Sequence, residues 1–219
     1  MERKLTVAPG VRPIIDWIDR FRWWIYDWQH RVETSGKTGL GDLTVASSNV
    51  AFGNNFHPTP PRTVRVLLRQ LQIRHSDYGF VDFGSGKGGV LLVAAEYPFL
   101  EVIGVEFAEE LHKTAERNIR QYKGVRLCRS VRSVHCDAVH FDFPLEPLVL
   151  YFFNPFQRRV MEQVLLNLVR SHQMCRRDIF LLYQAPHYPK DLVLATEGVL
   201  LFQQTDYFDI YRMPAKFGI

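Results

Sequence analysis

Apolar positions along residues 61–219 change their spacing repeatedly, from short continuous runs to a period of three or four. The short runs predict strands, whereas apolar residues three or four positions apart are typical of amphipathic helices. Because the two patterns alternate along the chain, we predict a parallel sheet with helices on both of its faces. The five strands predicted in this way are residues 79–83, 101–106, 131–136, 148–153 and 179–183.

The C-terminal part of the chain has a different pattern. Residues 199–204 and 207–213 are two strand-like runs with only a few residues between them, which is the signal of a hairpin. The hairpin adds antiparallel strands to one edge of the sheet. The predicted fold class is therefore α/β, with a doubly wound, mostly parallel sheet of seven strands and a C-terminal antiparallel hairpin.

The N-terminal part is set apart by its aromatic residues. All four tryptophans of the chain lie within residues 13–31, where aromatic side chains recur at helical spacing. Residues 32–60 are rich in Gly, Ser, Thr, Asn and Pro and predict an irregular connection. We therefore divide the chain into an N-terminal segment, residues 1–60, and a main domain, residues 61–219. The aromatic stripe consists of Trp17, Phe21, Trp24 and Trp28.

Four roles are open to the aromatic helix. It packs against the main domain, covers a substrate in the active site, pairs with another subunit, or lies on a membrane surface. Packing is the first interpretation and a substrate cap is the second. The oligomeric state is not predicted.

Composition narrows the class of protein. Hydrophobic residues make up 47% and charged residues 23% of the 219, which is usual for a globular protein in water. No apolar stretch is long enough to span a bilayer, and the N-terminus lacks the apolar core of a secretory signal. The three cysteines show no CxxC spacing. We expect a cytoplasmic protein without a membrane span, and its net charge of +4 permits an anionic partner without requiring one.

A glycine-rich turn follows the first predicted strand, in the sequence Asp82-Phe-Gly84-Ser-Gly86-Lys-Gly88-Gly89. Glycines at a strand-to-helix turn let a ligand approach the backbone closely, and this is where open α/β sheets bind ligands. A phosphate-binding P-loop is excluded because Ser or Thr does not follow the lysine. The turn formally satisfies the GxGxxG pattern of dinucleotide-binding proteins. However, a carboxylate two positions before the first glycine would repel a pyrophosphate and suits a cationic amino-acid end better.

On these residues the chain resembles class I S-adenosylmethionine-dependent methyltransferases, whose first motif is an acid followed by GxGxG. The resemblance covers residues 61–213 and implies a Rossmann-like methyltransferase fold with adenosylmethionine as the cofactor. It implies that Asp82 holds the amino group of the cofactor, that Glu106 binds the ribose hydroxyls, and that Asp137 accepts from the adenine amine. The glycines would pack against the methionine portion. Further expected cofactor contacts are Gly84, Ser85, Gly86, Gly88, Phe107, Ala138 and Asn154.

The chain also resembles a bacterial group of small, poorly characterised methyltransferases. That group combines a DTSG-like run, a PTP-containing entry helix, an FGSGKG loop and an NPF motif. The corresponding segments here are residues 33–36, residues 57–60, residues 83–88 and residues 154–156. This resemblance covers nearly the whole chain but names no substrate.

The acceptor side of the expected site is Asn154-Pro155-Phe156, directly after the fourth strand. It partly matches the Asn/Asp-Pro-Pro-Tyr/Phe motif of amino methyltransferases, where the polar side chain holds the target nitrogen and the aromatic ring stacks on it. The alternative is a polar turn whose phenylalanine packs inward. If the acceptor must lose a proton, His57 and Tyr183 are the candidate bases. No residues have the spacing of a metal site.

We therefore predict an S-adenosylmethionine-dependent methyltransferase. The acceptor is not identified, and a nitrogen or oxygen of a small molecule or a protein side chain is favoured. Nucleic acid is less favoured, because 60 residues before the main domain are too few for a separate target-recognition domain. Two alternatives remain open: a nicotinamide-dependent oxidoreductase that uses the same glycine loop, and a non-catalytic cofactor-binding partner protein.

Overall fold

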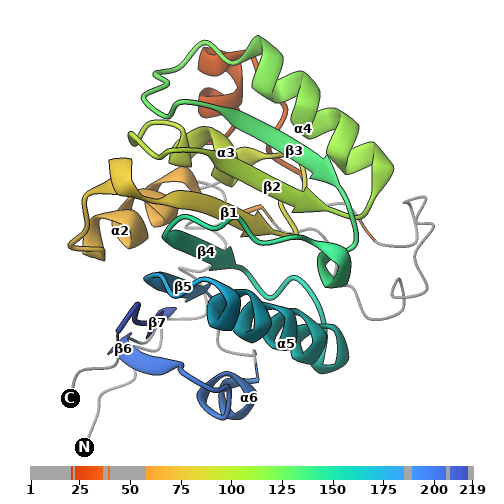
Figure 1. Ribbon diagram of the computed structural model, residues 1–219. Helices are drawn as coiled ribbons and strands as arrows, with labels where there is room; N and C mark the ends of the chain where they lie inside the picture. Colours follow the sequence, from red (N-terminus) through yellow and green to blue (C-terminus); the bar gives the residue numbers. More distant parts are fainter. Residues whose placement is uncertain are drawn as a thin grey trace, which may run out of the picture.

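The strands form where the sequence has its short apolar runs. A computed structural model describes residues 21, 23–36, 39, 58–184, 189–205 and 208–216. Its strands belong to a single sheet of seven, in the order β3-β2-β1-β4-β5-β7-β6 (Figure 1). They are β1 (Gly79–Phe83), β2 (Val102–Glu106), β3 (Val131–His135), β4 (Leu148–Phe152), β5 (Ile179–Gln184), β6 (Leu200–Gln204) and β7 (Phe208–Met213).

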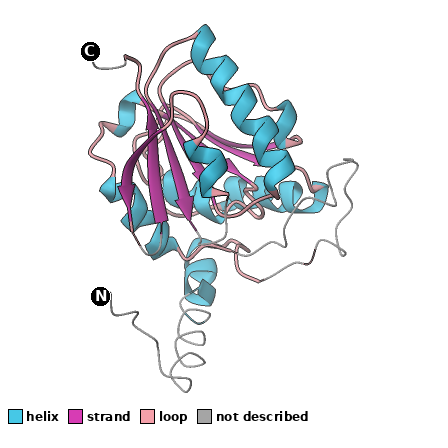
Figure 2. Ribbon diagram, turned by 90° about the horizontal axis from the view of Figure 1, so that it is seen from below, coloured by secondary structure: helices cyan, strands magenta, loops and turns pink. Residues whose placement is uncertain are grey.

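The pairing of these strands confirms the predicted fold class. The first five strands pair in parallel, and β7 is antiparallel to both of its neighbours, β5 and β6. Helices lie on both sides of the sheet, as Figure 2 shows. They are α2 (Pro61–Gln70), α3 (Gly89–Ala94), α4 (Glu109–Gln121), α5 (Arg158–Met174) and α6 (Lys190–Leu194), with short 3₁₀ helices η3 (His75–Asp77) and η4 (Ala138–His140). Helix α6 was not predicted.

Each face of the sheet has its own hydrophobic core, because successive side chains of a strand point to opposite faces. On one face, Phe83 and Leu150 pack with Leu168 of α5. On the other face, Phe80 packs with residues of α2 and α3, including Leu68. The central strands β1, β2 and β4 are buried along their whole length, as expected for parallel strands covered on both faces.

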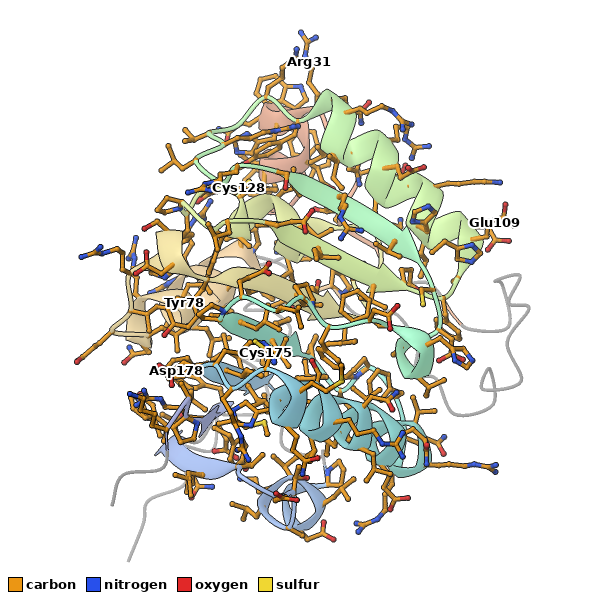
Figure 3. The ribbon with its side chains drawn as sticks, viewed as in Figure 1. Arg31, Tyr78, Glu109, Cys128, Cys175 and Asp178 are labelled. Atoms are coloured by element: carbon orange, nitrogen blue, oxygen red, sulfur yellow. The ribbon has the colours of Figure 1, made fainter. Side chains whose placement is uncertain are left out.

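Residues 23–36 of the N-terminal segment pack against this body. Residues 23–30 are helical, and Tyr26 belongs to the same core as α2 and α3. Next to it, Lys123 donates its backbone N–H to the carbonyl of His30 at 3.2 Å. Arg31 lies at the opposite end of α4 from Glu109, where that helix begins (Figure 3). The His30 contact therefore lies at the C-terminal end of α4.

The aromatic stripe is only partly described, and Trp17 lies outside the described residues. The exposed fractions are 59% for Trp24 and 71% for Trp28, so these indoles do not supply the packing contacts. No helix in the described part of the chain is long and apolar enough to cross a membrane.

Candidate functional site

The glycine turn between β1 and α3 has a backbone conformation that side chains rarely adopt. Gly84, Gly86 and Gly88 have φ angles of 74°, 53° and 80°. A Cβ added to Gly84 would lie 2.7 Å from the Cβ of Pro155. Glycine is thus required here both by the backbone and by the close approach of the loop that follows β4.

Glu106 lies beneath this turn at the end of β2. Its Oε2 accepts the N–H of Gly86 at 2.7 Å, and its Oε1 accepts the N–H of Ala108 at 2.9 Å. Burial raises the pKa of the carboxyl group, and the backbone hydrogen bonds oppose this shift. A carboxylate oxygen accepts more than one hydrogen bond, so each oxygen keeps capacity for a ligand hydroxyl.

Asp82 is the second buried carboxylate of the site, with an exposed fraction of 2%. Burial raises its pKa well above the ordinary range, and the nearby charge of Glu106 raises it further. Within the described part of the chain, no hydrogen bond stabilises this carboxylate. The charged form of a buried acid without hydrogen bonds is unfavourable, and a cationic group would stabilise it. Asp82, at the carboxyl end of its strand, is therefore suited to bind a cationic ligand group.

A pocket opens beside the glycine turn. Its walls are apolar except for the side chains of Asp137 and Cys136, and the Asp137 carboxylate accepts the N–H of Val139 at 3.1 Å. An apolar slot with one carboxylate suits a heterocycle that carries an amino group. The pocket brings together six residues that the sequence analysis selected. Its lining is Gly84, Val105, Phe107, Cys136, Asp137, Ala138, Pro155, Phe156 and Val160.

Pro155 and Phe156 of the Asn-Pro-Phe turn line this pocket, and Asn154 directly precedes them. Asn154 has a φ of 46°, a left-handed conformation that asparagine tolerates better than most residues. Phe156 packs inward, with its ring edge-on to Phe152 at 6.4 Å between centroids. This inward packing matches the alternative interpretation of the motif, a polar turn whose phenylalanine packs into the core. Phe156 nevertheless also lines the pocket, so the position of the turn beside the glycine loop is clear.

Two other selected residues, Ser85 and Tyr183, do not line the pocket. The hydroxyl of Ser85 is buried beneath the turn, where a Cβ on Gly104 would meet it at 2.6 Å, so the side chain faces β2 and not the pocket. Tyr183 is fully buried and donates its hydroxyl to the sulfur of Met161. Burial raises the pKa of Tyr183 well above its ordinary value, which does not favour the role of a base. His57 lies outside the described residues.

The Glu33–Gly36 run supports the glycine turn, and nothing in the sequence predicted this contact. Lys87 of the turn donates its ammonium to Glu33 Oε1 at 3.0 Å and to the carbonyl of Ser35 at 3.4 Å. The run is itself held by Asp27, whose carboxylate accepts two backbone N–H groups and two hydroxyls, from Thr34 and Ser35. The DTSG-like motif was visible in the sequence, but nothing in it indicated this contact with Lys87.

A second unforeseen group lies on the α2 face of the sheet. The hydroxyl of Tyr151 in β4 contacts Thr59, which precedes α2, and Gln184, which ends β5. These three residues are tens of positions apart along the chain, so no local sequence pattern indicates that they meet. No group of His, Cys, Asp and Glu side chains in the described ranges could hold a metal ion.

Comparisons with known proteins relate this site to methyltransferases. Residues 43–145 match the family described as Histone methylation protein DOT1. The ribosomal protein L11 methyltransferase of Stenotrophomonas maltophilia is 30% identical over 99 residues, an alignment that covers 41% of this chain and 32% of that protein. The chain thus matches about a third of the length of the curated relatives.

Solved structures share the architecture at low identity. A predicted N6-adenine-specific DNA methylase from Listeria monocytogenes has a TM-score of 0.53 at 12% identity, over 71% of this chain and 51% of that one. The PH0226 protein from Pyrococcus horikoshii has a TM-score of 0.51 at 16% identity, over 71% and 89%. The chain has the Rossmann-like methyltransferase fold.

Proposed function

We propose that this protein is an S-adenosylmethionine-dependent methyltransferase. The observation that carries the proposal is the pair of neighbouring buried carboxylates, Asp82 and Glu106, at a glycine turn that a pocket adjoins. The match to a histone methylation family and to a protein methyltransferase supports it.

The residues present fit this cofactor. Asp82 would hold its ammonium group, because a buried and uncompensated carboxylate gains most from a cation. Glu106 would accept from the ribose hydroxyls, and Asp137 from the adenine amine in the apolar pocket. Gly84 itself lines the pocket, so its backbone can contact the ligand there. When bound, the cofactor supplies an electrophilic methyl group on a sulfonium.

The contribution of the protein to transfer is then chiefly alignment. Holding an acceptor in line with the methyl group turns a bimolecular encounter into an oriented, effectively unimolecular step. We propose that Asn154 holds the acceptor, since its turn lies against Gly84 and forms a wall of the cofactor pocket. Neither Tyr183 nor any other described residue is needed as a base if the acceptor is a neutral amine.

Calorimetry tests the cofactor against the nicotinamide alternative. We expect adenosylmethionine and adenosylhomocysteine to bind with micromolar affinity, and NAD not to bind, because Asp82 would face a pyrophosphate at close range. Saturable binding of NAD, with no detectable binding of either sulfur compound, would reverse the assignment.

The acceptor is the less defined part of the proposal. We favour a nitrogen or oxygen of a small molecule or a protein side chain, and we place the enzyme in the cytoplasm. All three cysteines are free thiols, which suits that reducing compartment. Incubation of a bacterial extract with tritiated adenosylmethionine, followed by separation into protein, nucleic acid and small molecules, would locate the label. Label confined to nucleic acid would exclude the favoured classes, and no transfer at all would favour the non-catalytic alternative.

A further inference from the structure

The Tyr151 hydroxyl joins three segments of the chain in one hydrogen-bonded row. It donates to Oε1 of Gln184 at 2.5 Å and lies 3.0 Å from the hydroxyl of Thr59. A phenol has a single hydrogen, so Thr59 is the donor in the second hydrogen bond. Tyr151 is fully buried, and a phenylalanine would fill the same space without a polar group to satisfy. Packing alone therefore does not require the hydroxyl of Tyr151.

The position of this row places it beside the proposed cofactor site. Asp82 of β1 is paired directly with Tyr151 of β4, so both side chains are on the same face of the sheet. Tyr151 is paired with Leu182 of β5, and Gln184 is two residues further along that strand, on the same face. The row thus begins beside Asp82, at Tyr151, and continues toward the carboxyl end of β5.

The hydrogen bond from Tyr151 also orients the amide of Gln184. Because its oxygen is engaged by the phenol, the NH₂ group is the part left to donate to a ligand. Gln184 is only half-buried, at the end of its strand, whereas Tyr151 is enclosed. Tyr151 is accordingly a positioning residue, and Gln184 is the residue available for contact.

We propose that Gln184, positioned by Tyr151, donates a hydrogen bond to the carboxylate of the methionine portion of adenosylmethionine. This inference rests on the proposed function. The ammonium and the carboxylate of that portion share one carbon atom, and Asp82 attracts the first and repels the second. The carboxylate is thereby directed away from Asp82 along the row, toward neutral donors. Lys87, the cation of the glycine turn, is already engaged by Glu33 and the carbonyl of Ser35.

The test compares two ligands by calorimetry: adenosylmethionine, and its decarboxylated analogue, which keeps the ammonium group. For Gln184→Leu we expect about a tenfold loss of affinity for adenosylmethionine and no change for the analogue. Gln184→Glu places a negative charge against the carboxylate, so its loss should be larger and again confined to adenosylmethionine. Tyr151→Phe should show the same selectivity with a smaller loss, because the amide is present but no longer oriented.

Two reference variants complete the design. Asp82→Asn should weaken both ligands, because both carry the ammonium group. Tyr211→Phe, in a fully buried tyrosine of the core on the opposite face, should weaken neither. Thermal melting of each variant separates loss of fold from loss of contact.

Each result decides the inference. Equal losses for the two ligands, or unchanged affinity in both Gln184 variants, would overturn it. Unchanged binding with loss of methyl transfer would also overturn it and would assign Gln184 to the acceptor instead. If the unmodified protein binds neither ligand, the proposed function fails first, and that outcome is recognised before any variant is made.

Discussion

The two buried carboxylates of the site are held in different ways. Glu106 accepts two backbone hydrogen bonds, one from the glycine turn itself, whereas Asp82 is buried beside Glu106 without comparable support. Residues that cost stability and lie in a ligand crevice are expected where binding requires a charge at a fixed place. The two residues should therefore respond to substitution in opposite directions with respect to stability.

For Asp82→Asn we expect a more stable protein at pH 7, by about 1 kcal/mol, with at least tenfold weaker binding of adenosylmethionine. The raised pKa means that the folded protein retains a proton that the unfolded chain loses above about pH 4. The contribution of Asp82 to the free energy of unfolding therefore falls as the pH rises through the folded pKa. Asparagine does not ionise, so the variant does not lose this free energy. Urea unfolding at pH 7 and near pH 4 measures the difference in the free energy of unfolding between the variant and the unmodified protein. The gain should shrink at the lower pH, and a less stable variant at pH 7 would contradict the account.

For Glu106→Ala we expect the affinity for adenosylmethionine to fall at least about tenfold, since a charge-assisted hydrogen bond contributes about 1.5–3 kcal/mol. The structure adds a second consequence. The N–H groups of Gly86 and Ala108 lose their acceptor, so stability should also fall, by about 1–3 kcal/mol. Calorimetry and urea unfolding measure the two effects. An unchanged dissociation constant in a folded variant would remove Glu106 from the ribose site.

At the scale of elements, the helix of residues 23–30 and the turn after it act as a support for the glycine loop. Asp27 holds the turn through Thr34 and Ser35, and the turn holds Lys87. Asn118 of α4 adds hydrogen bonds to the carbonyls of Glu33 and Lys87. The DTSG-like run is thus a connection between the N-terminal helix and the cofactor loop.

Asp27→Asn should lower the free energy of unfolding by about 1.5–3 kcal/mol, because hydrogen bonds to a buried charge are lost or weakened. The affinity for adenosylmethionine should fall a few-fold, since Lys87 loses its anchored partner. Gln29→Ala, an exposed position on the same helix, is the control and should change stability by less than about 0.5 kcal/mol. Equal stability of the two variants in urea would show that the turn does not depend on Asp27.

At the scale of the whole molecule, residues 23–36 of the N-terminal segment pack with the main domain. Tyr26 and Val32 belong to the core formed with α2 and α3, and Thr34 lies against Gly89, the first residue of α3. The boundary at residue 60 therefore does not separate two independent packing units among the described residues. The substrate cap proposed for the aromatic helix stays a prediction, and the described contacts do not place that helix at the pocket.

Deleting residues 1–36 should lower the melting temperature by several degrees and weaken the binding of adenosylmethionine at least tenfold. The physical reason is that the deletion exposes apolar core and releases Lys87. A cap would instead leave cofactor binding within a few-fold while abolishing transfer. Differential scanning calorimetry and titration of the truncated protein distinguish the two. The double substitution of Trp24 and Trp28 by Gln tests the cap separately, since only a cap would lose transfer with cofactor binding intact.

Much of this protein was determined by short-range sequence features. The runs at β1, β4 and β5 predicted buried parallel strands, because an apolar run of five or six residues has no other stable place in an α/β fold. The glycine turn was equally clear, since its left-handed backbone demands residues without a Cβ. Topology brings the ends of neighbouring strands to one edge, and the resemblance to methyltransferases assigned Asp82, Glu106 and Asp137 to positions at those strand ends.

Only the tertiary structure decided which side chains face one another across long separations. The direction of the Ser85 hydroxyl, the support of Lys87 by Glu33 and the row from Thr59 to Gln184 leave no periodic signal. Periodicity reports which face of an element is buried, and a turn motif reports local backbone preference. Neither reports the packing of one element against another, because that depends on the shapes of side chains tens of residues apart.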